Sequence, residues 1–320
     1  MRISSGTLCG LLIVMLLTQP RPIGSQINAA GDQDVVSYRL RVPVDEVSLS
    51  FHATDRHGIA VNDLKLDELK LLDNGRPPLK IAVFEPLQDT SIRAGILMDT
   101  SDSMRDFVAR NRAISIEYAQ RLLRQQTDQA FVTEFGYLSA IVQPWTSDPA
   151  ALAAGLRKVS LGRENPLGGT ALFDAIYRTC FFEFGKIDGG ATGNFILLFS
   201  DGEDNASHMS LKEVVDACQR TNTAIYPFRA EPKDSLFSGG GTTLAELAAK
   251  TGGRVFHDNG SEEEIYDDLR VIEDDLRSQY RLIYKPAGSK HDGSFHRIEL
   301  KAPERVDTIT IRSGYYAPAH

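Results

Sequence analysis

Short, uniformly apolar runs that end abruptly in hydroxyls and carboxylates constrain this chain most. Ile96–Met98 leads directly into Asp99, and Phe195–Phe199 leads into Ser200 and Asp201. Such runs, without polar alternation, are typical of strands that are buried on both faces of a helix-covered parallel sheet. The polar residues then follow the carboxyl ends of the strands, where open α/β sheets bind their ligands. The sequence therefore predicts a doubly wound α/β sheet with a polar site at one edge.

The oxygen-bearing side chains at these strand ends form the candidate site. Asp99, Ser101 and Ser103 follow the first strand, and Asp201 follows the second. Between them, Thr170 lies in a Gly-Gly-Thr loop at the expected start of a helix, where glycine lets a backbone approach a bound ion closely. Carboxylate and hydroxyl oxygens without His or Cys favour Mg²⁺, with Mn²⁺ or Ca²⁺ as alternatives, over Zn²⁺. We therefore predict that these five residues form a metal site.

The same five positions carry a resemblance to a known family. In this order they resemble the metal-ion-dependent adhesion site (MIDAS) of von Willebrand factor type A (VWFA) domains, and the resemblance extends over roughly Ile92–Leu276. The stretch from Asp55-x-x-Gly58 through Asp73-Asn74-Gly75, together with the final Gly314–Pro318, resembles a bacterial VWFA-related family first described from acidobacteria. The resemblance implies the VWA fold, a Rossmann-like and mostly parallel sheet.

Both ends of the chain have a different pattern, with a period of two. Apolar and polar residues alternate over 47–53, and Asp73-Asn74-Gly75 between apolar stretches predicts a hairpin with Lys80–Phe84. The carboxyl end has three similar short stretches, at 279–284, 296–300 and 308–312. Neither end has enough strands for a covered sheet of its own. We predict one sandwich-like β-rich domain made of 35–88 plus 279–318, with the VWFA domain, 90–278, inserted between its halves.

Helix signals fill the middle of the chain. Ser210, Thr243 and Ser261 each precede a Glu by three residues, which predicts three capping boxes, and Asp148-Pro149 predicts another helix start. The stretch 239–241 is three glycines, but it lacks the lysine and the spacing of a phosphate-binding loop, so we expect a flexible loop. The last helix, Glu262–Arg277, is expected to hold the sheet through a single apolar stripe.

Two cysteines fall on predicted apolar helix faces. Cys180 lies at helical spacing from Ile176 and Tyr177, and Cys218 lies at helical spacing from Val214 and Val215. This placement favours buried free thiols. A disulfide is the alternative, because an exported chain meets an oxidising compartment.

The first 25 residues predict a signal peptide. Arg2 precedes an apolar run, Leu8–Leu17, and prolines follow the run at once. Such a run is too short to span a bilayer, so we expect cleavage, a secreted or periplasmic protein and no stable membrane insertion; an uncleaved anchor is the alternative. The chain carries 35 basic and 43 acidic residues, which argues against nucleic acid as a general partner.

Two classes of function compete for the predicted metal site. A metal-dependent hydrolase of the phosphatase type would attack from Asp99, but it would need an acid/base partner two residues on, where Ser101 stands. No lysine lies in the matching loops as a charge clamp. We therefore expect no enzyme but a protein-binding or adhesion module. In it three hydroxyls bind Mg²⁺ directly, two carboxylates act through water, and a partner's Asp or Glu carboxylate completes the coordination.

Overall fold

The computed structural model describes residues 46–88, 90–161, 168–186, 193–231, 239–257, 261–288 and 292–318. The predicted signal peptide, 1–25, and the first residues of the predicted β-rich domain lie outside the described residues. The chain from Val44 onward forms one compact unit. Within the described ranges, no helix is both long enough and apolar enough to cross a membrane.

A six-stranded sheet, in the order β6-β5-β4-β7-β8-β9, occupies the middle of the chain. Only its edge strand β6 is antiparallel to its neighbour. The two apolar runs form the adjacent central strands, and their side chains are almost fully buried, as predicted. The strands are β4 (Ile92–Asp99), β5 (Gln129–Phe135), β6 (Ser139–Thr146), β7 (Gly193–Ser200), β8 (Thr223–Arg229) and β9 (Phe256–His257).

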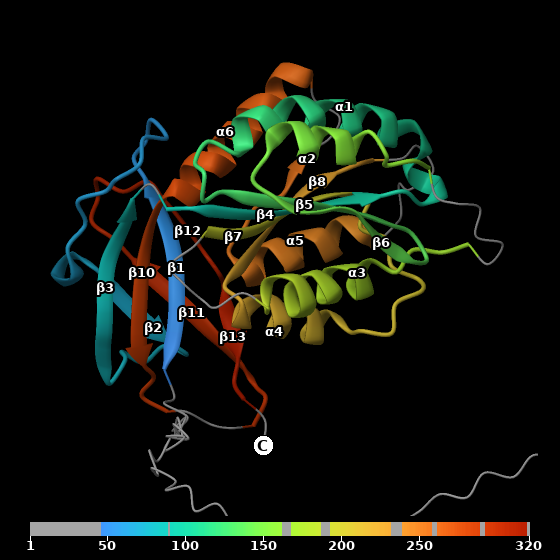
Figure 1. The fold of residues 1–320 in the computed structure, drawn as a ribbon. Helices are drawn as coiled ribbons and strands as arrows, with labels where there is room; N and C mark the ends of the chain where they lie inside the picture. The colour runs from blue at the N-terminus through green and yellow to red at the C-terminus, as the bar shows by residue number, and fades with distance from the viewer. Residues whose placement is uncertain are drawn as a thin grey trace, which may run out of the picture. The chain divides into compact units, whose positions relative to one another are not determined.

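Helices cover both faces of this sheet, and each face has its own apolar core (Figure 1). One face is covered by α1 (Arg105–Leu122), α2 (Pro149–Leu156) and α6 (Glu262–Arg277). The other is covered by α3 (Leu172–Arg178), the π-helix η3 (Thr179–Phe184), α4 (Leu211–Arg220) and α5 (Gly240–Thr251). The predicted doubly wound α/β fold is confirmed, and we call β4 through α6 the doubly wound part.

Most of the predicted helix starts are confirmed. Ser210 and Ser261 form capping boxes, and Asp148 caps α2. The prediction at Thr243 is wrong, because α5 already begins at Gly240. The predicted glycine loop is therefore the start of a helix. Glycine is needed there for close packing: a Cβ at Gly240 would lie 2.3 Å from the carbonyl oxygen of Asp201.

The two ends of the chain pair in two further sheets (Figure 1). Their orders are β12-β1-β10-β3 and β13-β11-β2, so each sheet mixes strands from both ends, and one apolar core is shared by both. This β-rich part is sandwich-like, as predicted, while the predicted domain boundaries stay predictions. Its strands are β1 (Val47–Thr54), β2 (Lys70–Asp73), β3 (Lys80–Gln88), β10 (Ser278–Lys285), β11 (Phe295–Lys301), β12 (Thr308–Ile311) and β13 (Gly314–Tyr316); η1 (Leu66–Glu68) is a short 3₁₀ helix.

The predicted hairpin at Asp73-Asn74-Gly75 is wrong, although the turn is present. Asn74 and Gly75 have the positive φ angles of a tight turn, 48° and 73°. However, β2 pairs with β11 and β3 pairs with β10, so the two strands enter different sheets. Pro77 and Pro78 follow the turn, and proline has no N–H to donate to a continued ladder with β2.

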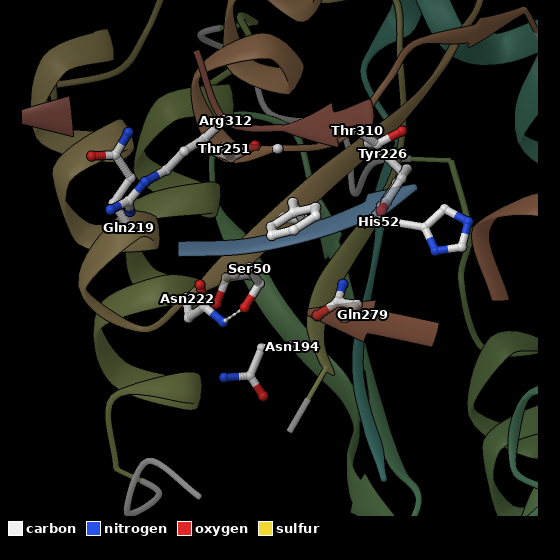
Figure 2. A pocket seen from close by; sticks show the side chains of 14 residues that line it. Ser50, His52, Asn194, Gln219, Asn222, Tyr226, Thr251, Gln279, Thr310 and Arg312 are labelled. Atoms are coloured by element: carbon white, nitrogen blue, oxygen red, sulfur yellow. Dashed lines mark hydrogen bonds between the residues drawn. The ribbon is translucent and has the colours of Figure 1, made fainter. Parts of the chain in front are cut away.

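Polar side chains meet where β1 approaches the amino edge of the central sheet. Asn222, in the turn before β8, donates a hydrogen bond from Nδ2 to Ser50 Oγ at 2.8 Å (Figure 2). The cavity between these elements measures about 20 Å³. This volume holds a water molecule rather than an organic ligand. The junction is therefore a closed polar contact.

Helix α6 is held by more than the predicted single stripe. Ile265, Leu269, Ile272 and Leu276 are buried as expected, but Glu273, Asp275 and Arg277 are buried as well. Arg277 Nη2 lies 2.8 Å from Asp128 Oδ2, and Asp275 Oδ2 lies 2.5 Å from Arg254 Nη2. The prediction of a purely apolar anchor is wrong, because the partner charges come from loops far away in sequence.

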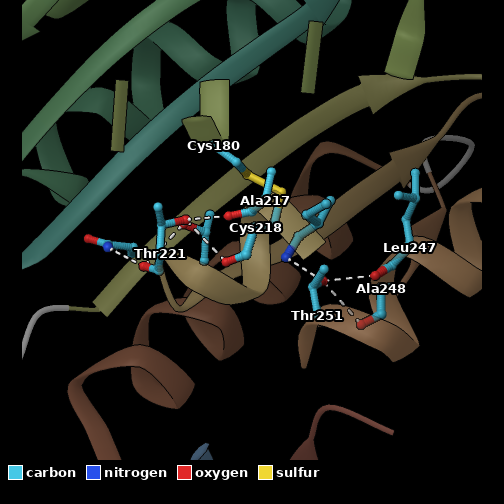
Figure 3. Close-up of a disulfide and its surroundings, with 10 residues drawn as sticks. Cys180, Ala217, Cys218, Thr221, Leu247, Ala248 and Thr251 are labelled. Carbon is cyan, nitrogen blue, oxygen red and sulfur yellow. Dashed lines mark hydrogen bonds between the residues drawn. A yellow bond between two sulfur atoms is a disulfide. The ribbon is translucent and has the colours of Figure 1, made fainter. Parts of the chain in front are cut away.

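Cys180 and Cys218 form a disulfide that joins η3 to α4 (Figure 3). Both side chains are fully buried, and their Cα atoms are 4.9 Å apart. The prediction of free thiols is therefore wrong. Helical spacing correctly put each cysteine on an apolar face, but it could not show that the two faces oppose each other.

Candidate metal site

The predicted site lies at the carboxyl edge of the central sheet. β4 and β7 are parallel neighbours, and Met98 pairs with Phe199, so Asp99 and Asp201 come from the same edge. Asp99, Thr170 and Asp201 expose only 1%, 4% and 3% of their surface. Ser101 is half-buried and Ser103 is exposed. The site therefore combines two carboxylates and the Thr170 hydroxyl, which are shielded from water, with two serines that are more accessible.

The three loops that carry the candidate ligands are joined by backbone contacts. Beyond the end of β5, Gly136 accepts a hydrogen bond from Ala171 N at 2.8 Å, and a Cβ at Gly136 would lie 3.9 Å from Ser101 N. Thr170 N donates to Asn205 Oδ1 at 2.8 Å, and Asn205 N donates to Thr170 O at 3.1 Å. The loop of Thr170 is thus hydrogen-bonded to the loops that follow β5 and β7, and the loop after β5 lies close to Ser101 in the loop that follows β4.

Several residues that position this site were missed by sequence reasoning. Gly169 has a φ of 95°, and a Cβ there would lie 2.9 Å from Asn205 Oδ1. The absence of a side chain at position 169 therefore allows the two loops to approach each other. Asp174 Oδ1 accepts from His208 N at 2.9 Å and from Met209 N at 2.8 Å, which fixes the loop after Asp201. Asp174 stands four residues after Thr170, but nothing in the sequence marks His208 and Met209 as partners of Asp174, or Asn205 as the partner of Thr170.

Asp99 is held in a hydrogen-bond network. Its Oδ1 accepts from Ser101 N at 3.0 Å, and its Oδ2 accepts from Ser200 Oγ at 2.7 Å. Ser200 Oγ in turn accepts from Gly202 N at 3.0 Å. Burial raises the pKa of Asp99 to about 6, against the hydrogen bonds from Ser101 and Ser200, and the charge of Asp201 adds to the rise. The two carboxylates are therefore close enough to repel each other.

Asp201 has an oxygen that lacks a partner. Its Oδ1 accepts from Glu203 N at 3.1 Å, whereas Oδ2 is buried without a hydrogen bond in the part of the chain that the structure describes. The same holds for Oε1 of Glu203. A buried carboxylate oxygen without a donor is destabilising by about 1–3 kcal/mol or more. A cation at this edge, or a water molecule bound to it, would satisfy the free oxygen, and the positive charge would screen the two carboxylates from each other.

The donor set fits a hard divalent cation. Ser101 Oγ and Ser103 Oγ are 3.2 Å apart. Among the described residues, no three His, Cys, Asp or Glu side chains gather in a metal-binding group. A metal here would therefore depend on hydroxyl oxygens as well as on the two carboxylates, which are ligands that suit Mg²⁺, Mn²⁺ and Ca²⁺. The assignment of all five residues as ligands stays a prediction.

Comparison with known proteins yields similar folds. No protein-family model matches the chain, and no curated protein does. BatB from Bacteroides thetaiotaomicron is 15% identical, covering 57% of this chain and 98% of that chain, with a TM-score of 0.45. A von Willebrand factor type A protein from Catenulispora acidiphila is 13% identical, covering 74% and 73%, with a TM-score of 0.45.

A third similar structure is proximal thread matrix protein 1 from the mussel byssus, with a zinc-occupied MIDAS motif. It is 14% identical, covering 65% of this chain and 50% of that chain, with a TM-score of 0.47. These three structures are similar to this chain in fold. What the site of this chain does is argued from its own residues.

Proposed function

We propose that this chain is a metal-dependent protein-binding module of the adhesion type, whose partner supplies an Asp or Glu carboxylate. One observation carries the proposal: Asp201 Oδ2 is buried without a partner beside a second buried carboxylate, Asp99. This edge also holds accessible hydroxyls, so a partner can reach a cation bound there.

The hydrogen bonds of Asp99 support a particular division of roles among the ligands. Both of its oxygens already accept hydrogen bonds, which favours contact with the ion through water. Ser101, Ser103 and Thr170 would then bind Mg²⁺ directly, with Asp201 also acting through water. Neutral hydroxyl ligands leave the ion electron-poor. A partner's carboxylate would therefore be a strong additional ligand.

The hydrolase alternative has less support. A nucleophilic Asp99 would need a free oxygen aimed at a substrate, but its two oxygens accept from Ser101 N and Ser200 Oγ. The residue two positions on is Ser101, which is no acid/base partner. We therefore propose binding rather than catalysis.

Calorimetric titration with Mg²⁺ tests the proposal. Asp99→Ala should weaken Mg²⁺ binding at least tenfold, because it removes one of the two buried charges that attract the ion. Asp102→Ala is the matched control, since it removes the same charge from the same loop. The Asp102 side chain is 92% exposed and pairs with Arg105. Equal Mg²⁺ affinity of the folded Asp99→Ala variant and the parent would contradict the metal site.

A second arm of the same experiment tests the role of the partner's carboxylate. Acetate should bind to the Mg²⁺-loaded parent and shift the amide resonances of Ser101 and Thr170. It should leave them unchanged in the metal-free protein. Identical shifts with and without Mg²⁺ would show that the ion does not recruit the carboxylate.

We also propose that the protein is exported to the periplasm or the medium. The disulfide between Cys180 and Cys218 supports this, because the cytosol of most organisms keeps such thiols reduced. The proposal includes cleavage of the predicted signal peptide, 1–25. The mass of the mature protein would show whether this segment is removed.

A further inference from the structure

A buried polar cluster lies in the β-rich part, and the proposed function leaves it unexplained. It joins Asp73, at the end of β2, to Tyr284 on β10, His296 on β11 and Tyr315 on β13. All four residues are buried. Asp73 and Tyr315 belong to the two motifs, Asp73-Asn74-Gly75 and Gly314–Pro318, that stand out near the ends of the sequence. The fold brings these motifs into contact.

Both carboxylate oxygens of Asp73 accept hydrogen bonds inside this cluster. Its Oδ1 accepts from His296 Nδ1 at 2.8 Å, and its Oδ2 accepts from Tyr284 at 2.8 Å and from Tyr315 at 2.9 Å. A carboxylate can only accept, so Nδ1 of His296 carries a proton. Burial and then the hydrogen bond to Asp73 raise the pKa of both tyrosines, which therefore remain donors.

The second ring nitrogen of His296 is left for another partner. Every hydrogen bond that the imidazole makes with the described residues uses Nδ1. His296 also lines a cavity of about 200 Å³. A carboxylate that holds Nδ1 fixes the orientation of the ring and leaves Nε2 to act on a ligand. The cluster thus positions an imidazole at the wall of a cavity.

Arg76 lines the same cavity. Its side chain is exposed, and its Nη1 would lie 3.7 Å from a Cβ added at Gly288, which lines the cavity too. No carboxylate among the described residues forms an ion pair with Arg76. Ser294, which also lines the cavity, adds a hydroxyl. With both oxygens of Asp73 accepting hydrogen bonds, the cavity presents a guanidinium and a hydroxyl as donors to an anion, and Nε2 of His296 becomes a third donor once the ring carries a second proton.

We propose that this cavity binds a small oxyanion, a carboxylate or a phosphate, between the Arg76 guanidinium and Nε2 of His296, which takes up a proton from solvent so that it can donate to the anion. The site exists only when both ends of the chain are folded together, because Arg76 follows β2 and His296 lies on β11, which pairs with β2. A single metal ion fits less well, since one imidazole is too few ligands. The proposal does not depend on the proposed function of the Mg²⁺ site.

Nuclear magnetic resonance of the His296 imidazole tests the proposal on metal-free full-length protein. Inorganic phosphate and acetate are titrated separately, so that the two oxyanions are distinguished. We expect at least one of them to shift the Nε2 resonance saturably, and Arg76→Gln to weaken that binding at least tenfold. Arg297→Gln is the matched control. Arg297 is exposed and follows His296 on β11, so its side chain leaves the other face of the strand.

Two results would overturn the proposal. One is the lack of a saturable shift with either anion at tens of millimolar. The other is equal weakening of anion binding by Arg76→Gln and Arg297→Gln. That result would mean that the anion is attracted by the general positive charge of the surface and not by the cavity. His296→Gln, if it folds, should also abolish binding. If His296→Gln does not fold, Arg76→Gln still decides the test, because Arg76 is exposed. Neither result would affect the outcome of the Mg²⁺ titration that compares Asp99→Ala with the parent, so the two proposals are tested independently.

Discussion

The doubly wound part and the β-rich part build their sheets in opposite ways. In the doubly wound part, the parallel strands are joined through covering helices and β5 leads directly into β6, all within one continuous stretch, 92–277. In the β-rich part, each sheet needs both ends of the chain: Val47 on β1 pairs with Tyr284 on β10, and Asp73 on β2 pairs with Ile298 on β11. The sheet of the first part can therefore form from segments that are close in sequence, whereas the sheets of the second part form only when distant segments meet.

One buried carboxylate from each part, Asp73 and Asp201, provides a second contrast. In the β-rich part, both oxygens of Asp73 accept hydrogen bonds from protein groups. At the edge of the central sheet, Asp201 keeps a buried oxygen without a partner among the described residues. A satisfied carboxylate fixes the position of its neighbours, and an unsatisfied one indicates that a ligand is needed. The contrast explains why the metal is proposed at Asp201, and why Asp73 serves to orient His296.

Deleting Leu282–His320 should have the largest effect on this comparison. The deletion removes β11, β12, β13 and half of β10, so β1 loses all of β12 and three of its five partners on β10, and its buried side chains Leu49 and Phe51 lose their cover. Unpaired strand edges and exposed apolar faces promote association. We expect aggregation in size-exclusion chromatography with light scattering. A monomeric truncation with the thermal stability of the parent would show that the two ends fold independently.

The sequence predicts the doubly wound part well because its signals are local. A capping box such as that of Ser210 is formed within four residues, and the uniformly apolar Ile96–Met98 reports burial on both faces directly. The candidate ligands could be grouped for a related reason. Parallel strands end at the same edge of a sheet, so Asp99 and Asp201 had to lie near each other once the strands were identified.

The contacts between distant segments could not be predicted, because they depend on which surfaces of the folded chain face each other. His296 and Asp73 are 223 residues apart, and each alone looks like an ordinary strand or turn residue. The pattern around Asn74 predicts a turn between two strands. It fits equally well whether those strands pair with each other or enter different sheets. Cys180 and Cys218 needed the packing of η3 against α4. Arg277 pairs with Glu273 at local i,i+4 spacing, but its pairing with Asp128, 149 residues away, has no local signal.

The buried ion pair that anchors α6 provides the next prediction. Asp128 is fully buried, accepts from Ile92 N at 3.0 Å and pairs with Arg277 at 2.8 Å. Asp128→Asn should lower the free energy of unfolding by about 3–5 kcal/mol, because it leaves the buried Arg277 charge without its main partner. Denaturant unfolding at neutral pH measures the loss.

A matched control and a pH series sharpen this test. Asp216→Asn breaks an exposed pair with Arg220, so it should cost less than about 1 kcal/mol. Although burial raises the pKa of Asp128, hydrogen bonds from Arg277 and from backbone N–H groups lower it below its usual range. Its stabilisation is therefore present above the unfolded pKa and is lost as the pH falls through the folded one. Equal losses in the two variants would show that the buried pair is no stronger an anchor than a surface pair.

The disulfide provides the last and smallest effect, and it lies wholly within the doubly wound part. Cys180 and Cys218 are 38 residues apart, and a bridge that closes such a loop stabilises a protein by about 2–4 kcal/mol, mainly by restricting the unfolded chain. Reduction should therefore lower the free energy of unfolding by this amount. It should leave Mg²⁺ binding unchanged at temperatures where the protein stays folded, because neither cysteine belongs to the candidate site.

The control for this prediction is the double variant Cys180→Ala/Cys218→Ala. Its stability should not respond to reductant, which separates the bridge from any effect of reductant elsewhere. Loss of Mg²⁺ affinity on reduction of the folded parent would contradict the expectation. Cys218 lies on α4, which follows the loop that Asp174 fixes beside Asp201, so such a loss would mean that the bridge positions the metal edge as well as the core.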